Sequence, residues 1–331
     1  MSPHVSVIST VYNEASSIVG LLDSLAAQTH LPDEVVIVDG GSTDDTLGLL
    51  QEQALSGSLP MLILSRPGLN IAAGRNAAIA AACGEIIAVT DAGVRLEPTW
   101  LEHLVAPFPE DPAPDVVSGF FVADPQSTFE KALGAITLPR LQELDLAAFQ
   151  PSSRSVAFRR AAWELVGGYP EWLDYCEDLV FNFCLRDAGL RFAVAPAAVA
   201  HFRPRPNLRA FFRQYYRYAR GDGKADLFQV RHLIRYGTYL LAAPLLLALA
   251  LWHSPWWWLG VAAGLLGLLR TPLARLGPWL RGASLGGKVA LLTWAPVIRV
   301  TGDVAKMLGY PAGVLWRRRH AAAEPWARRA R

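Results

Sequence analysis

Cysteine is scarce in this chain of 331 residues: there are three, at positions 83, 176 and 184, and their spacing matches no metal-ligand motif. Such a small, odd number argues against a disulfide framework and suits a reducing compartment. The first residues show no basic stretch followed by a long apolar core, so we expect no signal peptide. No Gly-x-Gly-x-x-Gly motif follows the first expected strand, which disfavours a dinucleotide-binding dehydrogenase.

Acidic residues become rare in the last part of the chain. Residues 1–200 contain 10 Lys and Arg against 25 Asp and Glu, whereas residues 201–331 contain 21 against 4. The acidic part is unsuited to nucleic acid, and the basic part surrounds apolar runs. Lys and Arg accumulate beside membrane spans on the cytoplasmic side. We therefore expect a cell-membrane protein with a cytoplasmic N-terminal domain and no nucleic-acid partner.

Apolar runs typical of strands alternate with helical patterns over the first 202 residues. This alternation predicts βαβ units and an α/β fold with a mostly parallel sheet. Residues 126–150 look helical or irregular. The expected strands are 5–12, 34–39, 61–65, 85–90, 116–122 and 191–195, and the expected helices are 15–28, 43–54, 71–83, 98–105, 159–167 and 177–188.

Polar side chains stand where the first two strands end. The run Val35–Val38 leads into Asp39 and a Gly-Gly-Ser-Thr-Asp-Asp turn, and the first strand leads into Thr10, Tyr12 and Glu14. In open α/β sheets, ligands bind at the carboxyl ends of the strands. With these motifs the chain resembles inverting family-2 glycosyltransferases of the GT-A type, over residues 1 to about 220.

The resemblance implies a nucleoside pocket at these strand ends. In such enzymes the aspartate after the second strand accepts a hydrogen bond from the donor's base, a role that falls on Asp39. Thr10, Tyr12 and Glu14 would form the rest of the pocket. The alternative is that Asp39 and Ser42 only cap the next helix, which the Ser-Thr-Asp-Asp cluster would explain by itself.

Arg75 lies near the start of the helix expected at 71–83. An arginine at a helix N-terminus, together with backbone N–H groups, can bind a diphosphate. Similar enzymes carry a nucleotide-contacting arginine here; the alternative is a surface residue.

Asp91-Ala92-Gly93 stands where the resembling enzymes have Asp-x-Asp. There the carboxylates contact the ribose and hold a divalent cation that bridges the phosphates, in keeping with the oxygen preference of Mg²⁺. Gly93 replaces the second aspartate, which leaves Asp91 as the donor-site acid. A Mg²⁺ or Mn²⁺ ion would then need phosphate oxygens, waters and one further protein ligand to complete its shell. His201, which follows the last expected strand, is a candidate further ligand.

Glu177 and Asp178 form an adjacent acidic pair at a helix start. Acids there interact favourably with the helix dipole, which is the plain explanation. Their order and distance after Asp91 match the Glu-Asp motif of the resembling enzymes, in which the aspartate is the general base for the acceptor hydroxyl. This implies Asp178 as the base and Glu177 as the residue that orients it or the acceptor.

Gln214 and Arg217 resemble the Gln-x-x-Arg-Trp element of membrane-bound relatives, with Tyr218 in the place of the tryptophan. The element lies near the diphosphate and acceptor in those enzymes. An ordinary basic, aromatic interfacial helix explains the same residues equally well.

The C-terminal part divides into three expected segments. Residues 203–235 read as basic amphipathic helices in the headgroup region, and 317–331 as a basic flexible tail. The region 236–316 contains two apolar spans, 236–252 and 256–270. Residues 285–316, which would form interfacial helices or a second hairpin, are interrupted by Pro296, Arg299, Asp303 and Pro311. Each span is slightly shorter than the ~20 residues that an untilted helix needs.

The resemblance thus implies a membrane-associated glycosyltransferase. It would move a sugar from a nucleoside diphosphate sugar, UDP above all, to a hydroxyl of a lipid or lipid-linked glycan in cell-envelope or glycolipid biosynthesis. Two alternatives remain open at this point: a non-catalytic membrane-anchored nucleotide-sugar-binding protein, and a nucleotidyltransferase. The second normally has a glycine-rich basic loop after its first strand, which Thr10–Glu14 is not.

Overall fold

A computed structural model of the chain describes residues 3–110, 112–146 and 149–320. The chain divides into two compact units, residues 1–124 with 141–202 and residues 125–140 with 203–331. Residues 125–140 therefore group with the helices that follow residue 202, although the sequence pattern places them within the first domain.

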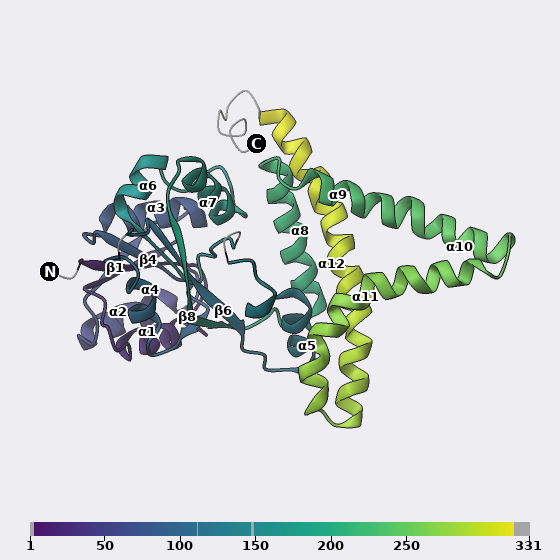
Figure 1. The fold of residues 1–331 in the computed structure, drawn as a ribbon. Helices are drawn as coiled ribbons and strands as arrows, with labels where there is room; N and C mark the ends of the chain where they lie inside the picture. Colours follow the sequence, from purple (N-terminus) through teal and green to yellow (C-terminus); the bar gives the residue numbers. More distant parts are fainter. Residues whose placement is uncertain (1–2, 111, 147–148, 321–331) are drawn as a thin grey trace. The chain divides into compact units, whose positions relative to one another are not determined.

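The first unit contains an eight-stranded mixed sheet in the order β3-β2-β1-β4-β7-β6-β8-β5. Figure 1 labels its strands β1, β4, β6 and β8. The strands β3, β2, β1 and β4 are parallel, whereas β7 runs antiparallel between β4 and β6, and β5 antiparallel to β8. The predicted α/β class is confirmed. The strands are β1 (Val5–Val11), β2 (Glu34–Asp39), β3 (Met61–Ser65), β4 (Ile86–Val89), β5 (Val94–Leu96), β6 (Val116–Ala123), β7 (Val156–Arg159) and β8 (Phe192–Phe202).

Helices cover both faces of this sheet, which is why its central strands are apolar without alternation. In β2, Val35 and Ile37 pack in one core with α1, α2 and α4, and Val36 and Val38 in the other with α3, α6 and α7. The helices are α1 (Ile18–Ala26), α2 (Thr46–Ser56), α3 (Ile71–Ala81), α4 (Trp100–Val105), α6 (Arg160–Val166) and α7 (Glu177–Asp187), with a 3₁₀ turn at Leu141–Glu143.

The strands predicted from the sequence differ from those of the structure in three places. It misses β5 and β7, which have three and four residues and carry too little periodicity to be recognised. It also ends the last strand at 195, before Pro196, whereas β8 continues to Phe202. A register shift between Ser118 and Phe120 of β6 accommodates the continuation, and such irregularities are where a sheet tolerates proline.

The second unit is helical. Its elements are α5 (Thr128–Thr137), α8 (Leu208–Lys224), α9 (Gln229–Tyr236), a π-helical segment (Gly237–Ala242), α10 (Ala243–Trp252), α11 (Trp257–Arg281) and α12 (Leu285–His320). Two continuous helices, Gln229–Trp252 and Trp257–Arg281, are long and apolar enough to cross a membrane by length and composition.

Helix α12 runs unbroken through Pro296 and Pro311, where the sequence predicts breaks. Each proline removes a backbone hydrogen bond, but packing along α8 holds the helix together. The last residues of α12 are 317–320, the start of the expected flexible tail, whose remaining residues 321–331 lie outside the described part of the chain.

Helices α8 and α12 approach each other backbone to backbone. A Cβ at Gly313 would lie 2.8 Å from the Lys224 nitrogen and 2.9 Å from the Gly223 Cα. Small residues spaced four apart, as Gly309 and Gly313 are, permit this close packing of helices, which is frequent in membrane proteins.

Candidate active site

The parallel strands bring three predicted donor-site residues to one edge of the sheet. Asp39, the last residue of β2, pairs in register with Val11 of β1, next to Thr10. Asp91 follows β4, which also pairs with β1. The carboxyl ends of β1, β2 and β4 therefore lie side by side, where an open α/β sheet receives its ligand.

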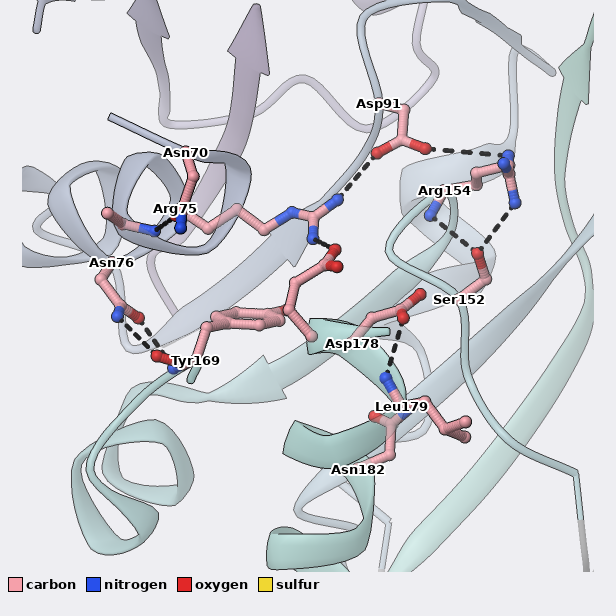
Figure 2. Close-up of polar contacts among 12 residues, drawn as sticks. Asn70, Arg75, Asn76, Asp91, Ser152, Arg154, Tyr169, Asp178, Leu179 and Asn182 are labelled. Carbon is pink, nitrogen blue, oxygen red and sulfur yellow. Dashed lines mark hydrogen bonds and ion pairs between the residues drawn. The ribbon is translucent and has the colours of Figure 1, made fainter. Parts of the chain in front are cut away.

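Helix α3 places Arg75 at this same edge. Its first turn is capped by Asn70, whose side chain accepts a hydrogen bond from the Ala73 N–H at 2.9 Å. A Cβ at Gly74 would lie 2.9 Å from the Thr10 methyl group, so glycine lets α3 approach β1 closely at this level. The guanidinium of Arg75 thereby reaches the strand ends, as Figure 2 shows.

Arg75 is the centre of a buried ion-pair cluster. It is 2% exposed, with Nη1 2.5 Å from Glu177 Oε1. Its Nη2 lies 3.0 Å from Asp91 Oδ1 (Figure 2). The cluster joins the end of β4 to the start of α7, which are far apart in sequence. Two acids that the sequence analysis assigns to different roles are thus held by one guanidinium.

Burial and charge shift the pKa values of this cluster in known directions. Burial alone would lower the pKa of Arg75, but the carboxylates of Glu177 and Asp91 outweigh it and raise that pKa. Burial raises the pKa of Glu177 above its ordinary value, against the lowering effect of Arg75, and the neighbouring Asp178 raises it further. Arg75 is therefore the group that opposes the effect of burial on the pKa of Glu177.

Asp178 follows Glu177 in the first turn of α7 and is half-buried. Its Oδ1 accepts the backbone N–H of Leu179 at 2.8 Å, which fixes the carboxylate at the helix start (Figure 2). The preceding residue, Cys176, has φ 66°, a left-handed conformation that non-glycine residues rarely adopt. Such a turn lets the chain enter α7 with both acids on the side of Arg75.

The ring of Tyr169 packs against the guanidinium of Arg75, a contact that the sequence does not predict. It is buried, the Arg75 guanidinium lies 5.5 Å from its ring centroid, and the ring stacks on Phe181 at 4.1 Å. Asn76 holds the adjoining turn by accepting the Tyr169 N–H at 2.8 Å and donating to its carbonyl at 2.9 Å. The sequence Gly167-Gly168-Tyr169-Pro170 is typical of a turn, but nothing in it indicates that Asn76 holds the turn.

Asp39 is buried, and its carboxylate is already engaged locally. It accepts hydrogen bonds from the N–H of Gly41 at 3.1 Å and of Ser42 at 3.1 Å, and from the Ser42 hydroxyl at 2.5 Å. These bonds close a local turn after β2 and do not cap the next helix, because α2 begins at Thr46 and its N-cap residue is Asp45. A carboxylate has about four acceptor positions, so these bonds and a bond to a ligand are compatible.

The other residues of the expected nucleoside pocket lie around the same loop. Tyr12 is 61% exposed at the end of β1. The carboxylate of Glu14 is held by the Ser17 hydroxyl, and Oε2 lies 3.8 Å from where a Cβ on Gly93 would be. Asn13, with φ 55°, accepts the Thr43 N–H at 2.8 Å and joins the two loops.

The residues described here do not fit a divalent cation. No group of three or more His, Cys, Asp or Glu side chains within residues 3–110, 112–146 and 149–320 has the arrangement of a metal site. His201, the candidate second ligand, lies inside β8 rather than after the last strand, and its Nε2 contacts the Glu97 carboxylate. Asp91 is therefore part of no such group of three, and the carboxylate nearest to the Gly93 position is Glu14, whose Oε2 lies 3.8 Å from where a Cβ on Gly93 would be.

Arg154 is a second guanidinium at Asp91 that sequence reasoning misses. Its Nε lies 3.7 Å from Asp91 Oδ2, on the side opposite to Arg75 (Figure 2). It precedes β7, the strand that the pattern does not reveal. No local signal identifies Arg154, because its position depends on which strand pairs with β4.

Gln214 and Arg217 belong to the helical unit. Gln214 donates to the Tyr218 hydroxyl at 2.9 Å, one turn along α8, and Arg217 is exposed. Their proposed contact with the diphosphate or acceptor stays a prediction.

Two family models match the chain. Glycosyl transferase family 2 matches residues 6–165, and Glycosyl transferase family group 2 matches residues 147–299. An uncharacterized glycosyltransferase of Nostoc sp. is 34% identical over 176 residues, 49% of this chain and 52% of that protein, so the chain spans about half of its length. The succinoglycan biosynthesis protein ExoA of Rhizobium meliloti is 29% identical over 222 residues, 64% of this chain and 67% of that protein.

A solved structure has the same fold. The mannosyltransferase PcManGT from Pyrobaculum calidifontis, in complex with GDP-Man and Mn²⁺, aligns with a TM-score of 0.59 at 23% identity, over 96% of this chain and 88% of that chain. The likeness confirms the predicted GT-A fold.

Proposed function

The chain belongs to glycosyltransferase family 2, and we propose that it is an inverting enzyme at the membrane. It would transfer a sugar from a nucleoside diphosphate sugar to the hydroxyl of a lipid or lipid-linked glycan. The observation that carries this proposal is the ion-pair cluster: Arg75 joins Asp91, at the strand ends, to Glu177, the neighbour of Asp178.

The chemistry needs a base on the face of the sugar opposite to the leaving diphosphate. We assign this role to Asp178, which would take the proton of the acceptor hydroxyl while that oxygen attacks the anomeric carbon. The bond from that carbon to the diphosphate breaks, its electron pair goes to the nucleoside diphosphate, and the configuration inverts. Glu177, paired with Arg75, would anchor the start of α7, and the Leu179 N–H holds the Asp178 carboxylate in place.

The donor would bind along the ends of β1, β2 and β4. Asp39 would accept a hydrogen bond from the base, with Tyr12 stacking nearby, and Asp91 would contact the ribose. We expect UDP as the nucleotide, and the GDP-Man complex of the mannosyltransferase makes GDP the alternative to test. Because the described residues do not fit a divalent cation, no step is assigned to one.

The membrane part of the proposal rests on the helical unit. The two candidate spans have only 6% and 11% of their apolar windows buried, unlike core helices of a soluble protein. Large apolar side chains such as Leu241, Leu245 and Trp252 are exposed along them. Helix α8 adds an arginine- and tyrosine-rich amphipathic surface suited to headgroups. An enzyme anchored in this way meets a lipid acceptor without extracting it.

The test is a transfer assay with the full chain in lipid nanodiscs. A panel of UDP-, GDP- and dTDP-sugars would be offered with membrane lipid extracts, and radiolabel counted in the organic and aqueous phases. D178N should lower transfer about 10²- to 10⁴-fold and keep donor affinity, since it removes only the base. D187N, the same change at the exposed end of α7, is the matched control.

Label confined to soluble acceptors would refute the lipid acceptor. Activity of D178N equal to that of D187N would refute the assignment of the base. Donor binding by the wild-type chain without any transfer or hydrolysis would favour the non-catalytic binding protein.

A further inference from the structure

Arg154 is fixed opposite Asp91 by the backbone of the sheet. Strands β4 and β7 are antiparallel with Val89 opposite Val156, so two further residues along the ladder bring Asp91 and Arg154 together. The hydroxyl of Thr90 donates to the Arg154 carbonyl at 3.1 Å and continues the pairing beyond the strand. The position of Arg154 at the strand ends is therefore built into the fold.

Two aromatic rings orient the side chain of Arg154. Its guanidinium carbon lies 4.6 Å from the Phe202 ring centroid and 5.5 Å from that of Phe121. Nη1 donates to the Ser152 hydroxyl at 3.3 Å (Figure 2). Stacked arginine loses little further freedom when it binds an anion, and its planar fork suits a phosphate.

The two guanidinium groups at Asp91 differ in access. Both Nη atoms of Arg75 bind carboxylates and the residue is 2% exposed. The side chain of Arg154 is 23% exposed, and its Nε is 3.7 Å from Asp91, an ion pair longer than a hydrogen bond. Arg154 is thus the more exposed of the two guanidinium groups at the strand ends.

Asp91 is a poor place for a divalent cation. Oδ1 faces Arg75 and Oδ2 faces Arg154, so a metal ion there would meet two positive charges. Gly93 supplies no side-chain ligand, and a Cβ at this position would lie 3.8 Å from Glu14 Oε2. The positive charge that a leaving diphosphate needs must come from another group.

We propose that Arg154 is this group and contacts the diphosphate of the donor in the place where Asp-x-Asp relatives hold a metal ion. The inference rests on the proposed function, because it requires a nucleoside diphosphate donor. As the bond to the anomeric carbon breaks, the diphosphate gains negative charge, and the guanidinium stabilises it with paired N–H···O bonds. Asp91 then keeps Arg75 as its partner.

Titration calorimetry on the full chain in nanodiscs tests this without relying on activity. The probes are UDP and GDP, with uridine and guanosine as their phosphate-free counterparts, each with excess EDTA or with Mn²⁺. The variants are R154Q, R154K and R191Q. Arg191 is an exposed arginine paired with Asp115 at 4.0 Å, so R191Q is the matched control for the same change. Thermal unfolding checks that each variant is folded.

We expect the wild-type chain to bind one of the diphosphates equally well in EDTA and in Mn²⁺. R154Q should lower the affinity for that diphosphate roughly 10- to 100-fold and leave the affinity for the nucleoside unchanged, as expected for the loss of a charged pair of hydrogen bonds. R154K keeps the positive charge but lacks the planar guanidinium, so its diphosphate affinity should lie between those of the wild-type chain and R154Q. A structural role alone would change nucleoside and diphosphate affinities together.

Two results would overturn the assignment: loss of wild-type diphosphate binding in EDTA, or R154Q affinities equal to those of R191Q. If the wild-type chain binds a diphosphate only with Mn²⁺, the metal-free assignment falls while the transferase proposal stands. If it binds neither diphosphate under any condition, the proposed donor itself is wrong.

Discussion

Replacing Arg75 should destabilise the first unit far more than an ordinary arginine change, because it leaves a buried carboxylate unpaired. Glu177 is 6% exposed and its main charged partner is Arg75 at 2.5 Å. Removing one member of a buried ion pair typically lowers the free energy of unfolding by about 3–5 kcal/mol. For a unit of this size that corresponds to a melting temperature lower by roughly 6–20 °C in R75Q.

The loss of stability in R75Q should depend on pH, and the burial of Glu177 determines in which direction. The pKa of Glu177 is raised in the folded chain, so above its ordinary value of 4.5 the folded state binds more protons than the unfolded state. Stability then falls as pH rises through that window and on to the raised pKa. Without Arg75 the pKa of Glu177 rises further, so stability is lost over a wider range of pH. R75Q should therefore recover part of its stability at acidic pH, where Glu177 is protonated.

The assay is thermal unfolding of the full chain in detergent, followed by tryptophan fluorescence between pH 5 and 8. R191Q removes one member of the solvent-accessible ion pair between Arg191 and Asp115, and it should change the free energy of unfolding by less than about 1 kcal/mol. E177Q in the R75Q background removes the buried charge and should restore most of the loss. A decrease in R75Q no larger than in R191Q, or the same at every pH, would refute the reasoning.

Two further substitutions test backbone contacts. G313A should lower the free energy of unfolding by about 1–3 kcal/mol, because the new methyl group meets the α8 backbone at the Arg220 carbonyl, whereas G277A, with nothing within 4 Å, should be nearly neutral; equal melting temperatures would contradict the close packing. G168A should cost about 1–3 kcal/mol, since φ is +83° and its Cβ would lie 2.8 Å from Asn76 Oδ1; unchanged thermal unfolding and donor affinity would show that this turn tolerates a side chain.

The pattern of hydrophobic residues in the sequence predicts most of the strands and helices of the first unit. Buried apolar runs that end in a polar residue locate β2 and β4 to within a residue, and with them Asp39 and Asp91. The uncharged runs 236–252 and 256–270 likewise overlap the two candidate spans, although the helices extend to Gln229 at one end and to Arg281 at the other. These features are local: periodicity and composition over about ten residues decide them, and that information lies in the chain itself.

The partners of the site residues are a different matter. Arg75 reads as a diphosphate ligand in the sequence, but folding places it between Glu177 and Asp91. His201 reads as a metal ligand, but the register of β8 places it beside Glu97. Arg154 carries no signal at all, since its position follows from β7 pairing with β4. The sequence alone determined which strand ends carry polar groups; tertiary structure decided which of those groups meet, because pairing and burial depend on segments far apart in the chain.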